Sequence, residues 1–216
     1  MSSWERKYLD QQRKAIAATR KLWTNECKPE RERMIVRAFL RCIGVTFASE
    51  EVRSPQEDPP DVVFRDAAFE VTEDLGGRKR GDEWREREER FAAAKSIEDV
   101  MEPYTPSQQI TAGDSWQQAV DALGKKAIRY GISGCAHLDG LVYLTPGGAH
   151  MWPIEAISTS DLTEELVRQG WRSASLLLPP YGVVLSAGSD APEFMKALQG
   201  RTLNEWPDQV GAGLFD

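Results

Sequence analysis

The sequence predicts a mixed α/β domain with a central sheet flanked by helices. Short apolar segments typical of strands occur in two groups, within residues 45–72 and 140–187. Segments with helical spacing lie before, between and after these groups. The resulting order of helices, three strands, helices, strand, helix and strands is not the regular alternation of a wholly parallel sheet. We therefore expect both parallel and antiparallel neighbours.

Length and composition favour a single globular domain in the cytoplasm. The chain has 216 residues, of which 41% are hydrophobic and 28% charged, values typical of a well-buried domain. Its three cysteines are too few and too scattered for a disulfide framework or a zinc site. Neither a signal peptide nor an apolar run of roughly 20 residues is present, so no membrane partner is expected.

Charge is distributed unevenly along the chain. The net charge is −7, yet residues 1–47 hold 11 Lys and Arg against 5 Asp and Glu. After Lys95 the balance reverses to 7 against 15. A nucleic-acid partner would therefore meet the N-terminal half of the protein, although a charge run of this kind is also typical of a solvated helix.

The N-terminal elements are two helices. Residues 3–23 carry loosely spaced apolar residues among basic ones, which predicts a helical arm over residues 1–25 and a candidate homodimer contact. The remaining residues, 26–216, are expected to form one domain. A second helix begins near Pro29 and ends near Ile43. Glu32 falls inside its apolar stripe, so this acid should face the body of the protein.

The later elements are predicted from the spacing of apolar residues and from the turn residues between them. Strand patterns and helical patterns alternate with turn residues that bound them. The predicted strands are 45–47, 61–64, 68–72, 140–145, 173–178 and 182–187, and the predicted helices are 82–100, 116–130, 161–169 and 192–199.

The hairpin of residues 57–74 concentrates acidic side chains. If Asp66 and Ala67 form a two-residue loop, Asp61 faces Thr72 directly and Glu70 lies diagonal to it on the same sheet face. Asp74 continues this parity. Carboxylates so close repel one another unless a counter-charge is present. Mg²⁺ or Mn²⁺ is the natural counter-charge, since both prefer oxygen ligands.

The segment "PPDVVFRDAAFEVT", preceded by the helix that carries Glu32, resembles the PD-(D/E)xK nuclease superfamily, which has the restriction-endonuclease-like fold. "DEWRERE" and "LVRQGWRSASLL" are further similar to a bacterial family of uncharacterised proteins described as endonucleases. The resemblance implies a magnesium-dependent nuclease acting on DNA. Asp61 and Glu70 would be its metal ligands and catalytic acids, and Glu32 the helix acid.

One position departs from the motif. Thr72 occupies the place of the motif lysine, and a hydroxyl carries no charge. Lys126 on the helix 116–130, or Lys79 in the glycine-rich loop, are the candidate replacements, and the helix positions Lys126 more firmly. Thr72 would then hold a water molecule.

Several basic residues are candidates for phosphate contacts, because cations near the acidic patch would neutralise a nucleic-acid backbone. They are Arg78, Lys79, Arg80, Lys125 and Arg129. Two other functions stay open from the sequence: a catalytically inactive nuclease fold that binds nucleic acid or protein, and a regulatory module that docks a basic partner.

Overall fold

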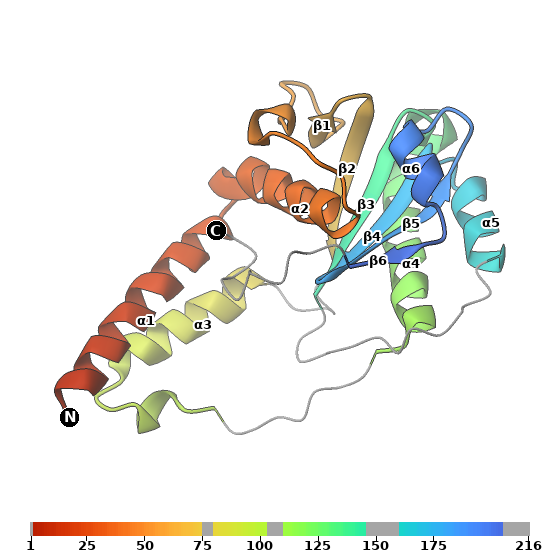
Figure 1. The fold of residues 1–216 in the computed structure, drawn as a ribbon. Helices are drawn as coiled ribbons and strands as arrows, with labels where there is room; N and C mark the ends of the chain where they lie inside the picture. Colours follow the sequence, from red (N-terminus) through yellow and green to blue (C-terminus); the bar gives the residue numbers. More distant parts are fainter. Residues whose placement is uncertain (1, 75–79, 103–109, 146–159, 205–216) are drawn as a thin grey trace.

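The computed structural model describes residues 2–74, 80–102, 110–145 and 160–204. It confirms the mixed α/β fold (Figure 1). The helices are α1 (Ser3–Leu22), α2 (Lys28–Cys42), α3 (Arg80–Ala93), α4 (Ala112–Cys135), α5 (Ser160–Arg168) and α6 (Glu193–Leu198). The strands are β1 (Val62–Phe64), β2 (Ala67–Asp74), β3 (Asp139–Leu144), β4 (Ser173–Leu178), β5 (Tyr181–Ala187) and β6 (Thr202–Leu203).

The six strands form one mixed sheet in the order of the sequence, β1 to β6. β2, β3 and β4 are parallel neighbours, whereas β1, β5 and β6 pair antiparallel at the two sides. Every residue of β3 and β4 is buried, as expected for parallel strands covered on both faces. The β2–β3–β4 unit is therefore the rigid base on which β1 is held.

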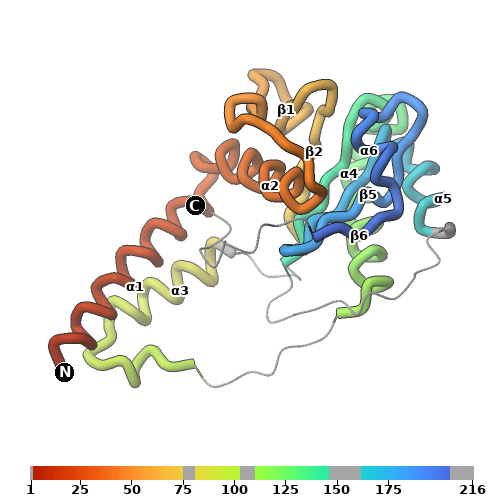
Figure 2. The backbone as a smooth tube through the Cα atoms, viewed as in Figure 1, coloured from red at the N-terminus to blue at the C-terminus, as the bar shows by residue number. Residues whose placement is uncertain are grey.

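Helices cover both faces of this sheet (Figures 1 and 2). α2 and α6 pack on one face, where Phe39 makes an edge-on contact with Phe69 of β2. α4 and α5 pack on the other face, where Leu123 and Trp171 belong to a second apolar cluster. β2 is consequently approached by a helix from each side, α2 and α4.

α1 and α3 lie side by side, away from the sheet (Figures 1 and 2). Leu9 and Ile16 of α1 are buried against Phe91, and Arg13 donates hydrogen bonds to the carbonyl oxygens of Phe91 and Ala94. The predicted N-terminal arm is therefore paired with a helix from the middle of the chain. Its two buried apolar residues are already used within the chain, and homodimer contact through α1 stays a prediction.

Three details differ from the sequence-based expectations. Residues 45–47 are not a strand, because Val45 and Phe47 pack against the core from irregular backbone instead of pairing with a neighbour. The helix expected over 82–100 begins at Arg80 and ends at Ala93, followed by a short 3-10 helix, Glu98–Val100. The two-residue strand β6 was not predicted. No helix in the described ranges has the length and apolar character needed to cross a membrane.

Candidate metal and active site

The β1–β2 hairpin places Asp61 beside the middle of β2. Phe64 pairs with Ala67, so the loop is Arg65–Asp66 and the predicted register, with Asp66 and Ala67 in the loop, is wrong. Arg65 adopts the left-handed conformation with φ 53°, which two-residue hairpin loops require. Ala67 is therefore the first residue of β2 and is buried in the core, at 2% exposure. Asp61 now lies opposite Glu70 and Val71 instead of Thr72.

Glu70 points away from the apolar cluster that holds Phe69 and Val71, toward α4. It is only 1% exposed. Its Oε1 atom accepts hydrogen bonds from the Lys126 ammonium group and from the Tyr130 hydroxyl at 2.8 Å. Lys126 and Tyr130 are four residues apart and therefore share one helix face. Lys126 also donates to the Val71 carbonyl oxygen at 2.9 Å.

Asp61 is held between β2 and α2. Its Oδ2 atom accepts the backbone N–H of Val71 at 2.9 Å and lies 3.8 Å from the Lys126 ammonium. Its Oδ1 atom accepts a hydrogen bond from Lys28 at 3.1 Å. Lys28 also pairs with Glu32, one turn later on α2, at 2.9 Å. Two lysines from two helices thus neutralise a group of buried carboxylates.

Burial shifts the proton affinities at this site. It raises the pKa of the Glu32 carboxyl to about 7, against the opposing hydrogen bond from Lys28 and with a further contribution from the Asp61 charge. Burial acts to lower the pKa of Lys28, but its bonds with Glu32 and Asp61 outweigh burial and raise this pKa above its ordinary value. Burial and the Glu70 charge also raise the pKa of Tyr130. Tyr130 therefore stays protonated and donates to Glu70 near neutral pH.

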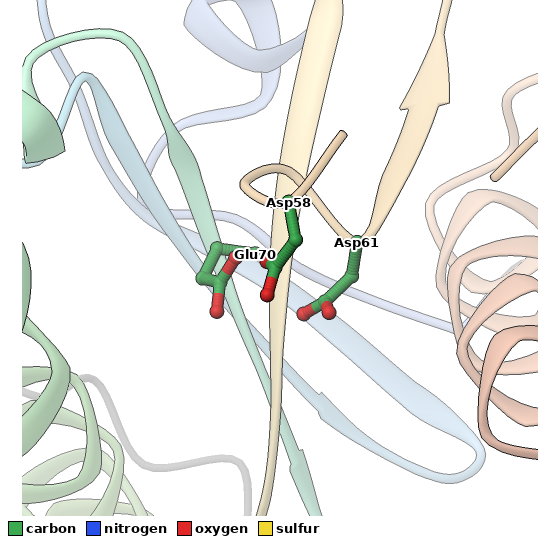
Figure 3. A group of neighbouring side chains, drawn as sticks. All are labelled: Asp58, Asp61 and Glu70. Atoms are coloured by element: carbon green, nitrogen blue, oxygen red, sulfur yellow. The ribbon is translucent and has the colours of Figure 1, made fainter. Parts of the chain in front are cut away.

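Three carboxylates converge in a way that could hold a divalent cation. One oxygen each from Asp58, Asp61 and Glu70 lies within 4.8 Å of the others, and Figure 3 shows these side chains directed toward a common space. Asp58 is exposed and lies in the loop before β1. The Oε2 atom of Glu70 is buried and accepts no hydrogen bond from the described residues. A buried anionic oxygen without a partner is costly, so the donor set fits a hard cation.

The predicted site residues do not all meet. Glu32, Asp61, Glu70 and Lys126 are brought together. Thr72 follows on β2, but its buried hydroxyl makes no hydrogen bond within the described residues.

The predicted phosphate-binding residues are scattered. Arg78, Lys79 and the side chain of Arg80 lie outside the described part of the structure. On α4, Lys125 lines a surface hollow toward α5, whereas Arg129 stacks over the Tyr130 ring at 5.3 Å and so borders the carboxylate site.

Sequence reasoning missed Lys28, Asp58 and Tyr130. Lys28 stands four residues before Glu32, a spacing that puts both on one helix face and could have identified it. Asp58 lies before the predicted strand 61–64, and Tyr130 fits the apolar period of the predicted helix 116–130. No short-range signal indicates that these two side chains reach Glu70, because their contacts depend on how α4 and the loop pack on β2.

Comparison with known proteins gave two matches. A family model described as "Putative endonuclease, protein of unknown function (DUF1780)" matches residues 4–208. A solved structure from Pseudomonas aeruginosa strain PAO1, described as protein of unknown function PA4535 of the monooxygenase superfamily, is 29% identical to this chain. The similarity covers 97% of this chain and 98% of that chain, with a TM-score of 0.62. No curated protein matches the chain.

Proposed function

The chain belongs to the DUF1780 family, and from this premise we propose that it is an endonuclease that hydrolyses DNA phosphodiester bonds with the help of Mg²⁺ or Mn²⁺. The observation that carries the proposal is the buried Oε2 atom of Glu70, which lacks a hydrogen-bond partner within the described residues beside the carboxylates of Asp61 and Asp58. The resemblance of the surrounding hairpin to the PD-(D/E)xK nucleases supports the same chemistry.

In this proposal Asp61 and Glu70 hold the cation, and Asp58 adds a ligand from the loop. The bound cation would activate water and stabilise the charge that develops on the phosphate. The protein's part is to fix the two buried carboxylates before substrate arrives. The Val71 N–H and Lys28 orient Asp61, while Tyr130 and Lys126 orient Glu70.

Lys126 is proposed to replace the lysine that the motif places at Thr72. Its ammonium group contacts Glu70, the Val71 carbonyl oxygen and, at 3.8 Å, Asp61. A cation at this position can stabilise negative charge on a phosphate bound at the carboxylates. Thr72 keeps its proposed role of holding a water molecule. Glu32, whose pKa is raised to about 7 by burial, would act through Lys28 as a positioning residue.

One observation favours a second candidate, a catalytically inactive nuclease fold that binds nucleic acid. Lys28 and Lys126 already neutralise Asp61, Glu32 and Glu70. If these ammonium groups replace the cation permanently, the fold and any nucleic-acid surface would persist without turnover.

Nicking of supercoiled plasmid separates the two candidates. The wild-type protein should nick DNA with Mg²⁺ or Mn²⁺ and not with EDTA. Asp61→Asn and Glu70→Gln should each reduce the rate by at least about 100-fold, because each removes an anionic ligand at the reacting centre. Lys126→Ala should also slow the reaction, and Lys126→Arg should restore part of the rate because it keeps the charge.

Glu164→Gln is the matched control, since Glu164 is an exposed carboxylate on α5. It should leave the rate unchanged. Wild-type protein that cleaves no DNA or RNA substrate above the level of Glu70→Gln, while remaining folded by circular dichroism, would favour the inactive binding module.

A further inference from the structure

The first helix carries a regular series of basic doublets. Arg and Lys occur together at 6–7, 13–14 and 20–21, so that each doublet follows the previous one by seven residues. Seven residues are nearly two turns of an α-helix. The first members therefore line one side of α1, and the second members, Lys7, Lys14 and Lys21, line a neighbouring side. We call these three lysines the lysine row.

The arginines and the lysines of the doublets differ in their contacts. Arg13 and Arg20 reach α3, where Arg13 binds two carbonyl oxygens and Arg20 pairs with Glu88. The lysine row lies on the opposite side of α1 from the buried Leu9 and Ile16, at 100° per residue. All three of its lysines are exposed.

The lysine row has no carboxylate partner within the described ranges. Glu5 accepts the N–H of Ser2 at the helix N-terminus, and Asp10 pairs with Arg13 at 3.1 Å. Both acids of α1 are thus engaged elsewhere. Lys7 and Lys14 also line a shallow surface hollow of about 430 Å³. Arg6 and Asp10 line the same hollow, so three cations there face one acid that is already paired with Arg13. A row with this excess of cations is an electrostatic surface for a polyanion, in a protein whose net charge is −7.

We propose that the lysine row binds the phosphate backbone of double-stranded DNA. Successive lysines are about 10.5 Å apart along the helix axis, so the row spans about 21 Å, or roughly six base pairs. A straight, rigid row of this length suits a duplex. The inference deepens the proposed function by naming a second contact with the same substrate, at a distance from the carboxylates.

Two other polyanions fit less well. Sites for single-stranded nucleic acid interleave basic residues with stacking aromatics. Here the residues between the lysines are Asp10, Gln11 and Ala18, and the exposed aromatics Trp4 and Tyr8 lie near Lys7 alone. An amphipathic helix on a lipid surface inserts its apolar face, whereas Leu9 and Ile16 are buried against α3. Duplex DNA needs neither a stacking surface nor a free apolar face.

Fluorescence anisotropy with a duplex of about 24 base pairs in EDTA tests this inference without any cleavage. Lys7→Ala with Lys14→Ala should weaken binding at least about tenfold at about 100 mM salt, and should reduce the slope of log Kd against log salt by about 1.8. Adding Lys21→Ala should bring the reduction in slope to about 2.7. Alanine is a strong helix former, so α1 should persist, which circular dichroism checks.

The control double variant, Arg168→Ala with Arg201→Ala, removes two exposed cations elsewhere and should change the slope little. Equal effects of both double variants would overturn the inference. So would binding to single strands or to anionic vesicles that is as tight as binding to the duplex. Binding that depends on the lysine row in a protein without nicking activity would refute the proposed nuclease and keep the inference. Nicking activity in a protein whose DNA affinity does not depend on the lysine row would overturn the inference and keep the proposed nuclease.

Discussion

Two buried acidic clusters lie on this sheet, and they differ in how completely their oxygens are used. Asp139 at the start of β3 is fully buried. Its Oδ1 accepts from Arg172 and from Ser173, at 3.1 and 2.7 Å, and its Oδ2 accepts from Arg172 and from the N–H of Ala68. Glu70 is equally buried, yet only its Oε1 has partners among the described residues.

The difference teaches which acid is structural. A carboxylate with every acceptor position filled joins strands to one another, and Asp139 does so for β2, β3 and β4. A buried carboxylate with one free oxygen contributes less to stability than it could. Such an incomplete arrangement is expected where a ligand completes it. The two acids should therefore differ in what their substitution costs, and added metal and pH should act on the carboxylates around Glu70.

The largest expected difference is in the cost of replacing each acid by its amide. In Asp139→Asn the new NH₂ group meets a donor on either side, because both oxygens accept hydrogen bonds. Arg172 also loses its charge partner, so the free energy of unfolding should fall by about 3 kcal/mol. In Glu70→Gln the NH₂ group can take the unpartnered Oε2 position, and the carbonyl oxygen keeps Tyr130 and Lys126 as donors. Unlike Arg172, Lys126 retains a second carboxylate, that of Asp61 at 3.8 Å. The free energy of unfolding should change by less than about 1 kcal/mol.

Urea denaturation of the two variants at one pH measures both values. The fraction of Asp139→Asn that remains folded should still nick DNA, whereas Glu70→Gln should lose activity while staying folded. Similar destabilisation of both proteins would erase the distinction between a structural and a ligand-binding acid.

A somewhat smaller effect is expected from divalent cations. Mg²⁺ that binds only the folded protein should raise the free energy of unfolding by about 2.7 kcal/mol at about 100 times its Kd. Glu70→Gln and Asp61→Asn should abolish this increase, and the control Glu164→Gln should keep it. The measurement is urea denaturation with MgCl₂ or with NaCl at equal ionic strength. An identical increase with NaCl, or in all variants, would contradict a cation site at these carboxylates.

The sequence predicts this contrast only in part. Strand alternation places Glu70 off the apolar face, and helical period brings Glu32 and Lys126 to inward positions, because both signals are local. The register of the hairpin was wrong, since Arg65 gives no sign of the left-handed conformation that fixes the loop. The sequence also does not predict that both oxygens of Asp139 have all their hydrogen-bond donors. Its donors come from two segments far from it in the chain, Ala68 and Arg172–Ser173, and only tertiary packing assembles them.

The smallest expected effect is a pH dependence of the free energy of unfolding, caused by Glu32 beside Asp61. Burial raises the pKa of Glu32 from 4.5 to about 7, so the folded protein binds a proton more tightly there than the unfolded chain does. The stability this contributes is fully present below about pH 4.5 and is lost as the pH rises to about 7. Glu32→Gln mimics the protonated form. Relative to this variant, the wild type should lose on the order of 2 kcal/mol of unfolding free energy between those pH values.

Urea denaturation of both proteins across this pH range gives the difference directly, and it cancels titrations that the two proteins share. Glu164→Gln serves as the control, because an exposed carboxylate should give no such trend. A difference between wild type and Glu32→Gln that stays constant with pH would mean that Lys28 keeps Glu32 ionised throughout. The carboxylates around Asp61 would then be balanced as completely as Asp139 is, and only the free oxygen of Glu70 would still favour a cation at this site.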